Sequence, residues 1–494
     1  MRRRLNNLNT LSLFNQFVKT HPNNIAIDNG YEKISYLELN NLINKISINL
    51  DGSESLIGVL GYKLINTYAS ILSIHSIGAG YVPLNPSFPL ERTIKMIKIS
   101  KIKTVLIPQE DDIYTKKLQE KLPEINFLYI NNLNQDKKTL KEKIKNDTNK
   151  TAYILFTSGS TGNPKGVPIS KENLLSYMDF LIRTYPLVPS DRCSQAFELT
   201  FDLSVHDIFV TLSQGACLVP LSNTDIYFPA HFIHKNKISV WFSVPSLINV
   251  IDKMKHLSTK YLSSLRLSFF CGEALEYRLA NKWLTAASNS RLINLYGPTE
   301  ATIAITHFEV TEKGKENNIV PIGKVFDGNE FKITDNNNEL MLSGKQLTKS
   351  YLNDPIKTKE AFIELDNKVF YKTGDKVKLI NYQLNYISRL DGQVKVNGNR
   401  VELNEVEEVY RGLIKSHQIV VLKETDQSHN DYLVLFINSN EDIKLNLTKI
   451  NEKAKESLPS YMIPLEISFQ TIFPTNSNGK IDKKKLKETY RSKL

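Results

Sequence analysis

Cysteine is scarce in this chain, which contains only Cys193, Cys217 and Cys271. None of the three belongs to a CxxC pair or has a histidine at metal-ligand spacing, which argues against a disulfide framework and against a zinc site. Long apolar runs are also missing, and the basic N-terminus MRRRLNNLNTLSLFNQFVKT lacks the apolar segment of a signal peptide. We therefore expect a cytoplasmic protein without membrane insertion.

Internal repeats and low-complexity segments are absent, and the composition is that of an ordinary globular protein, with 41% hydrophobic and 23% charged residues. Sixty-three Lys and Arg residues against 52 Asp and Glu give a net charge of +11. This excess favours anionic partners such as nucleotides or an acidic carrier protein, although a lysine-rich surface is the simpler explanation. Residues 136–150 alternate in charge without interleaved aromatics, so no nucleic-acid partner is expected.

Short apolar runs alternate with segments of helical periodicity along most of the chain. The runs predicted as strands are 57–62, 104–109, 152–157, 216–221, 238–244 and 266–272. This alternation predicts a layered α/β body with mostly parallel sheets. From about residue 320 the pattern changes to short strands and turns, which indicates a small β subdomain, and a new small α+β pattern begins near residue 390.

The stretch ILFTSGSTGNPKGV, residues 154–167, has the composition of an anion-binding loop. It is not a Walker P-loop, because Lys165 is followed by Gly166 and not by Ser or Thr. Its glycines allow backbone amides to turn inward, and its hydroxyls and Lys165 suit a polyphosphate. Taken alone, the loop fits an ordinary surface turn after a strand equally well.

Further motifs decide between these readings: NLYGPTEATIA (294–304), YKTGD (371–375), RLDGQVKVNGNRVELNEVE (389–407) and PTNSNGKIDKKKL (474–486). With the loop, they stand in the order and spacing of the adenylate-forming superfamily, and the chain resembles the amino-acid adenylation domains from end to end. The resemblance implies an AMP-binding N-terminal domain, residues 1–388, and a small mobile C-terminal lid domain, residues 389–494. We expect a monomer.

The resemblance also implies an ATP site. The residues that it assigns to ATP are Thr157, Ser158, Thr161, Lys165, Asn294, Tyr296, Gly297, Pro298, Thr299, Asp375, Arg389 and Lys480. By this resemblance the loop holds the β- and γ-phosphates and Tyr296 stacks on adenine. Asp375 accepts the ribose hydroxyls and Arg389 binds ribose and phosphate. Glu300 is assigned to Mg²⁺.

Catalysis in such enzymes has two half-reactions, an adenylation that releases pyrophosphate and a thiolation that releases AMP. The resemblance makes Lys480 the catalytic cation, with Thr299 at the α-phosphate and Glu300 also among the catalytic groups. It makes Asp391 the hinge about which the small domain rotates between the two steps. Gly398 is then expected to line the channel for the thiol, where a side chain would block a pantetheine arm.

The segment FDLSVHDIF, residues 201–209, points to an amino-acid substrate. In the resembling domains the aspartate of FDxS pairs with the α-ammonium group, so Asp202 takes that role; a simple helix N-terminal aspartate is the alternative. The expected pocket positions are Asp202, Leu203, His206, Phe242, Phe269, Cys271, Leu295, Ile303, Ala304 and Lys480. Their bulk leaves little volume, which favours glycine or alanine.

Within the family the chain most resembles the D-alanine:carrier-protein ligases, through FDLSV, FFCGEAL and YGPTEATIA. That likeness places Cys271 against the substrate methyl group and makes D-alanine the best candidate, with a phosphopantetheine-bearing carrier protein supplied in trans. His206 and Leu295 depart from this group, and a histidine here could pair with a polar or acidic side chain or turn out of the pocket. The alternatives are a stand-alone nonribosomal-peptide-type adenylation enzyme for another amino acid, an acyl- or aryl-CoA ligase, and a catalytically silent binding protein.

Overall fold

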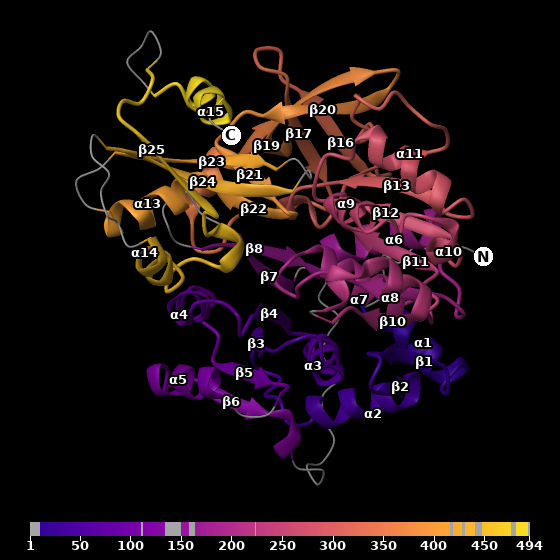
Figure 1. Cartoon of the computed structure of the whole chain (residues 1–494). Coiled ribbons are helices and arrows are strands. Elements are labelled where there is room, and N and C mark those ends of the chain that lie inside the picture. Colours follow the sequence, from indigo (N-terminus) through magenta and orange to yellow (C-terminus); the bar gives the residue numbers. More distant parts are fainter. Residues whose placement is uncertain are drawn as a thin grey trace. The chain divides into compact units, whose positions relative to one another are not determined.

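The computed structural model describes residues 10–109, 112–133, 150–157, 164–222, 224–414, 418–426, 430–439, 447–475 and 481–492 (Figure 1). The chain divides into two compact units. The first comprises Met1–Pro86, Met96–Phe156 and Gly166–Leu390, and the second comprises Ser87–Lys95, Thr157–Lys165 and Asp391–Leu494. Among the described helices, none is both long and apolar enough to cross a membrane.

A large sheet in the first unit carries three of the six predicted apolar strands, β10, β11 and β12. Its strand order is β15-β14-β13-β12-β11-β9-β10-β1-β2. The strands are β1 (Ile25–Asp28), β2 (Lys33–Ser35), β9 (Arg192–Gln195), β10 (Cys217–Pro220), β11 (Val240–Ser243), β12 (Leu267–Phe270), β13 (Arg291–Tyr296), β14 (Thr306–Val310) and β15 (Lys324–Val325). Strands β9 to β13 run parallel. Parallel strands need crossover connections, which helices largely supply here: α7 (Leu203–Leu212), α8 (Pro229–Lys235), α9 (Ser246–Lys253), α10 (Thr259–Leu262) and α11 (Tyr277–Ala286).

A second sheet has the order β6-β5-β3-β4-β7-β8. Its strands are β3 (Leu56–Leu60), β4 (Gly80–Leu84), β5 (Thr104–Ile107), β6 (Asn126–Tyr129), β7 (Thr151–Thr157) and β8 (Lys165–Ser170). The accompanying helices are α1 (Ser12–Thr20), α2 (Tyr36–Ser47), α3 (Ile65–Ser76), α4 (Leu90–Ser100), α5 (Ile113–Lys121) and α6 (Lys171–Thr184). Helices α2 and α6 begin with capping boxes at Ser35 and Ser170, which satisfy backbone N–H groups at the first turn.

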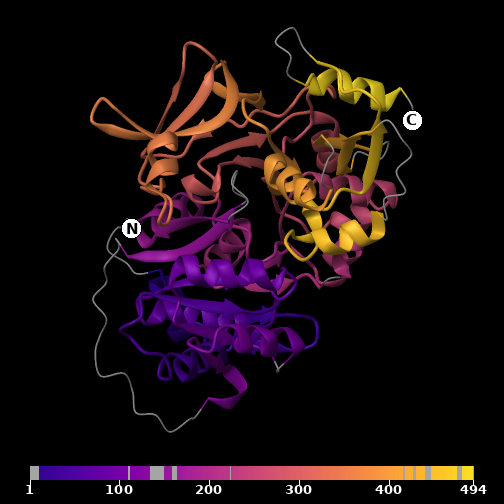
Figure 2. The ribbon, with the colours of Figure 1, turned by 90° about the vertical axis from the view of Figure 1, so that its left-hand side faces the viewer.

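An antiparallel sheet follows, drawn in orange in Figure 2. It contains β16 (Asn329–Ile333), β17 (Glu339–Gly344), β18 (Phe362–Leu365), β19 (Lys368–Ile380) and β20 (Gln383–Arg389), with α12 (Pro355–Ala361) between β17 and β18. This sheet is the β subdomain that the change of pattern near residue 320 predicted.

The last segment of the second unit is a small α+β structure. It contains β21 (Gln393–Val396), β22 (Asn399–Glu402), α13 (Leu403–Leu413), β23 (Ile419–Thr425), β24 (Asp431–Asn438), α14 (Leu447–Ala454), β25 (Glu466–Gln470) and α15 (Lys483–Arg491). Its core is formed by apolar side chains of α13 and the β23-β24-β25 sheet, among them Val406, Val421 and Leu435. The predicted mixed α/β fold class is confirmed.

Candidate active site

The carboxyl end of β13 presents two of the residues expected at the nucleotide. Asn294 and Tyr296 are two positions apart, so their side chains share one face of the strand. The Asn294 Nδ2 donates to the Pro321 carbonyl at 2.9 Å, while its Oδ1 is buried with no partner in the described part of the chain. An orphaned buried acceptor suits an incoming donor such as the exocyclic amine of adenine.

Tyr296 and Asp375, which are buried, and the half-buried Arg389 form one hydrogen-bonded polar group. The Tyr296 hydroxyl donates to Asp375 Oδ2 at 2.5 Å, and Arg389 Nη1 donates to Asp375 Oδ1 at 3.0 Å. Asp375 and Arg389 face each other across the β19–β20 pair, which fixes their separation. Burial, followed by the neighbouring Asp375 carboxylate, raises the pKa of Tyr296 well above its ordinary value, so the phenol stays a proton donor. The structure thus brings the expected adenine and ribose residues into contact.

The backbone after Tyr296 is tightly packed and strained. A Cβ at Gly297 would lie 2.6 Å from Ala304 Cα, so only glycine lets the two segments approach. Thr302 and Ile303 have φ angles of 58° and 71°, a left-handed conformation that is rare for a β-branched residue. The Gln346 carbonyl accepts from Thr302 Oγ1 at 2.5 Å, and Gln346 Nε2 donates to the Ala304 carbonyl at 2.8 Å. Gln346, which no sequence motif marked, therefore holds this segment in place.

Glu300 is fully buried in a short 3₁₀ turn, Thr299–Ala301, that follows Pro298. The Tyr351 hydroxyl donates to Glu300 Oε1 at 2.8 Å, which orients the carboxylate. Mg²⁺ in nucleotide sites is commonly held by one or two carboxylates together with substrate phosphates, so an oriented buried carboxylate fits the expected ion. Tyr351 was missed because it lies outside every recognised motif.

The phosphate loop is described only at its two ends. Thr157 closes β7, and its Oγ1 is buried without a hydrogen-bond partner among the described residues. Lys165 opens β8 and is half-buried. Ser158 and Thr161, with the rest of 158–163, lie outside the described residues, as does Lys480. Their predicted roles stay predictions.

Asp202 occupies the N-cap position of α7 and is buried, yet its side chain makes no capping hydrogen bond. Helix capping therefore does not explain this carboxylate. The apolar pocket positions all belong to one buried cluster; they are Leu203, Phe242, Phe269, Cys271, Leu295, Ile303 and Ala304. This cluster is the large apolar core of the first unit, so the predicted substrate pocket stays a prediction.

His206 packs among the pocket aromatics and does not turn away from them. Its ring centroid lies 4.6 Å from that of Phe242 and 5.6 Å from that of Phe269. The Tyr177 hydroxyl and His206 Nδ1 are hydrogen-bonded at 2.7 Å. Burial lowers the pKa of His206 to about 3, so the imidazole is neutral near pH 7 and offers no cation to an acidic substrate. This hydrogen bond places Tyr177, which was not predicted, beside the expected pocket, and burial raises the pKa of its hydroxyl.

Comparison with known proteins agrees with this geometry. Residues 14–352 match the model of the AMP-binding enzyme family. The chain belongs to this family. It is 31% identical to the D-alanine--D-alanyl carrier protein ligase of Bacillus velezensis, over 92% of this chain and 94% of that protein. The ligase of the same name from Lactococcus lactis is 29% identical, over 96% of this chain and 98% of that protein.

Among solved structures, the chain is similar to the Vibrio cholerae adenylation domain AlmE in complex with glycyl-adenosine-5'-phosphate. The TM-score is 0.86 and the sequence identity 30%, and the match covers 100% of this chain and 99% of that one. Family membership confirms the resemblance drawn from the motifs. The predicted enzyme class, an AMP-forming ligase, is confirmed with it.

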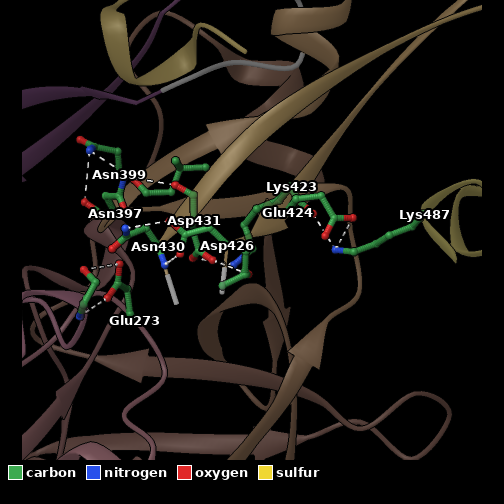
Figure 3. Close-up of polar contacts among 12 residues, drawn as sticks. Glu273, Asn397, Asn399, Lys423, Glu424, Asp426, Asn430, Asp431 and Lys487 are labelled. Carbon is green, nitrogen blue, oxygen red and sulfur yellow. Dashed lines mark hydrogen bonds and ion pairs between the residues drawn. The ribbon is translucent and has the colours of Figure 1, made fainter. Parts of the chain in front are cut away.

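In this AMP-binding enzyme, Gly398 lies in a two-residue turn between β21 and β22, where Val396 pairs with Asn399. Asn397 and Gly398 have φ angles of 48° and 84°, as a type I′ turn requires. Figure 3 shows how the turn is anchored, since Asn397 Nδ2 donates to the Asp431 carbonyl at 3.2 Å. The turn alone therefore accounts for glycine here, and the expected thiol channel stays a proposal. Asp391 Oδ1 accepts from the Gln393 N–H at 3.1 Å, just after β20 ends.

Proposed function

We propose that the enzyme activates a small amino acid, with D-alanine as the best candidate, and transfers it to the phosphopantetheine thiol of a separate carrier protein. The observation that carries this proposal is the position of Asp202, which is buried at the head of α7 and stands where the FDxS motif has its aspartate. A carboxylate at this position can form an ion pair with the α-ammonium group of an amino-acid substrate. The relatives named as D-alanine--D-alanyl carrier protein ligases support both the amino acid and the carrier.

In the adenylation step, a carboxylate oxygen of the amino acid attacks the α-phosphorus of ATP. The new O–P bond forms as the bond to the β-phosphate oxygen breaks, and pyrophosphate leaves. We assign Tyr296, Asp375 and Arg389 to the nucleoside, and Thr299 and Lys480 to the charge that develops on the phosphate. We also assign Glu300 to Mg²⁺, which when bound would neutralise phosphate charge; its buried, oriented carboxylate supports this assignment.

In the transfer step, the thiol sulfur attacks the carbonyl carbon of the aminoacyl-AMP, and AMP leaves as the thioester forms. We assign Asp391 as the hinge and the Gly398 turn as part of the thiol path. The anchored turn between β21 and β22 supports a fixed wall at this position.

Glycine is the second candidate. The solved adenylation domain that is 30% identical to this chain was crystallised with glycyl-adenosine-5'-phosphate. The His206 imidazole, which packs against both Phe242 and Phe269, supports a pocket with little room for a side chain. Glycine and D-alanine differ by one methyl group, which hydrophobic pockets discriminate by only about 1–3 kcal/mol.

The transfer is tested by incubating the enzyme with ATP, D-alanine or glycine, and a purified holo D-alanyl carrier protein from a relative. We expect AMP release and a mass increase on the carrier equal to one aminoacyl group, which hydroxylamine removes. A matched reaction with coenzyme A in place of the carrier tests the acyl-CoA ligase alternative. A thioester formed on coenzyme A but not on the carrier would contradict the proposal.

A further inference from the structure

The loop that leads to Asp202 is held by two charged residues outside the nucleotide site, the half-buried Lys63 and the buried Asp207. Strand β9 ends at Gln195, residues 196–202 form the connection, and α7 begins at Leu203. Lys63 Nζ donates to the Ala196 carbonyl at 3.1 Å and lies 3.5 Å from the Leu221 carbonyl. On the other side of the same residue, the Ala196 N–H is hydrogen-bonded to the Asp207 carboxylate. Ala196 is thus fixed through both of its backbone polar groups.

These two residues come from different parts of the first unit. Lys63 follows β3 of the second sheet, whereas Asp207 lies within α7, one turn after Asp202. The Asp207 side chain is buried, and its Oδ2 has no hydrogen-bond partner within the described ranges. Burial raises the pKa of Asp207, and the nearby Lys63 ammonium acts in the opposite direction. Such a charge is costly to keep in a core, so its retention calls for an explanation.

Neighbouring contacts extend the restraint along the loop. The Tyr68 hydroxyl donates to Gln195 Oε1 at 2.9 Å, and Gln195 Nε2 donates to the Phe197 carbonyl at 2.5 Å. The Phe197 ring then packs on Phe242 of the pocket wall, with centroids 5.1 Å apart. The loop therefore has little freedom between the end of β9 and Asp202.

We propose that Lys63 and Asp207 are positioning residues that clamp Ala196 and thereby fix where Asp202 meets the substrate ammonium group. The proposal rests on the proposed function, since it takes Asp202 as the ammonium partner. The clamp acts on a group that the amino acid contacts and ATP does not. It should consequently affect the amino-acid KM and leave the ATP KM unchanged.

Lys63→Met keeps the aliphatic stem and removes the donor to Ala196. In pyrophosphate exchange we expect its amino-acid KM to rise about tenfold, the size of one lost charge-assisted hydrogen bond, with an unchanged ATP KM. Lys63→Arg, which restores a donor, should recover most of the loss. Lys171→Met is the matched control, because Lys171 is a buried lysine that likewise donates to a backbone carbonyl, that of Gly78, at 2.6 Å. The control should change neither KM.

A double-mutant cycle with Asp202→Asn separates positioning from general destabilisation. If Lys63 acts through Asp202, Lys63→Met should cause little further loss once Asp202 is replaced. Additive losses, or equal rises in both KM values, would overturn the proposal. If Lys63→Met does not fold, Asp207→Asn carries the same test, because it keeps the size and the acceptor while removing the charge. If the wild-type enzyme shows no ATP–pyrophosphate exchange with any amino acid, the proposed function itself is refuted. If the wild-type enzyme exchanges normally and Lys63→Met has an unchanged amino-acid KM, only the clamp is refuted.

Discussion

Replacing Tyr296 by Phe is the sharpest test of the nucleotide site. The change keeps the ring that is expected to stack on adenine and removes only the hydroxyl that donates to Asp375 Oδ2 at 2.5 Å. A hydrogen bond to a charged acceptor contributes about 1.5–3 kcal/mol. Because Arg389 still donates to Asp375 Oδ1 at 3.0 Å, we expect the lower end of that range. This corresponds to about a tenfold rise in the ATP KM.

The assay is pyrophosphate exchange at saturating amino acid with ATP varied. Tyr36→Phe is the matched control. Tyr36 lies on helix α2, outside the proposed site, and its buried hydroxyl donates to the Ala216 carbonyl at 2.8 Å. The control should lower the melting temperature without changing the ATP KM. An unchanged ATP KM in folded Tyr296→Phe enzyme would refute the assignment of this group to ATP.

Other predictions concern the backbone, the metal and pH. Gly297→Ala should abolish exchange, because the added Cβ would lie 2.6 Å from Ala304 Cα; wild-type activity would show that this packing is dispensable. Tyr351→Phe should raise the Mg²⁺ concentration needed for half-maximal exchange several-fold, because Glu300 loses the hydrogen bond from the Tyr351 hydroxyl. An unaltered Mg²⁺ titration would show that Tyr351 does not belong to the site. Burial lowers the pKa of His206 to about 3 from 6.5, so the unfolded chain takes up a proton that the native state does not. His206 alone should therefore lower the free energy of unfolding by about 1.4 kcal/mol per pH unit below pH 6.5. Because burial also lowers the pKa of His75 to about 3, His206→Gln should reduce the slope measured by urea unfolding from pH 7 to 5 by that amount without abolishing it. Parallel slopes in the two proteins would contradict a neutral buried imidazole.

The strands were predictable because their burial leaves a simple mark on the sequence. Runs such as LSFF in β12 and VWFS in β11 are buried at every position, as expected for parallel strands covered on both faces. The Gly398 turn could also have been predicted from its Asn-Gly pair, which is typical of tight hairpins.

Other features depend on contacts between residues far apart in the chain. Tyr177 reaches His206 across 29 positions, and Gln346 reaches Ala304 across 42, while neither lies in a recognisable motif. Buried tyrosine and glutamine are unremarkable in a sequence until tertiary structure supplies their partners. Lys63 is a similar case, since it resembles any surface lysine until its bond to Ala196 is seen.

The central claim is that the buried Asp202 and its apolar surroundings select a small amino acid. The most direct measurement is ATP–pyrophosphate exchange with Mg²⁺ and no thiol, across glycine, both alanines, both serines and the acidic amino acids, for wild type and Asp202→Asn. The account predicts exchange with D-alanine or glycine, no exchange with acidic amino acids, and a large rise in the amino-acid KM in Asp202→Asn at an unchanged ATP KM. Exchange that is strongest with an acidic amino acid, or that is indifferent to Asp202, would contradict it.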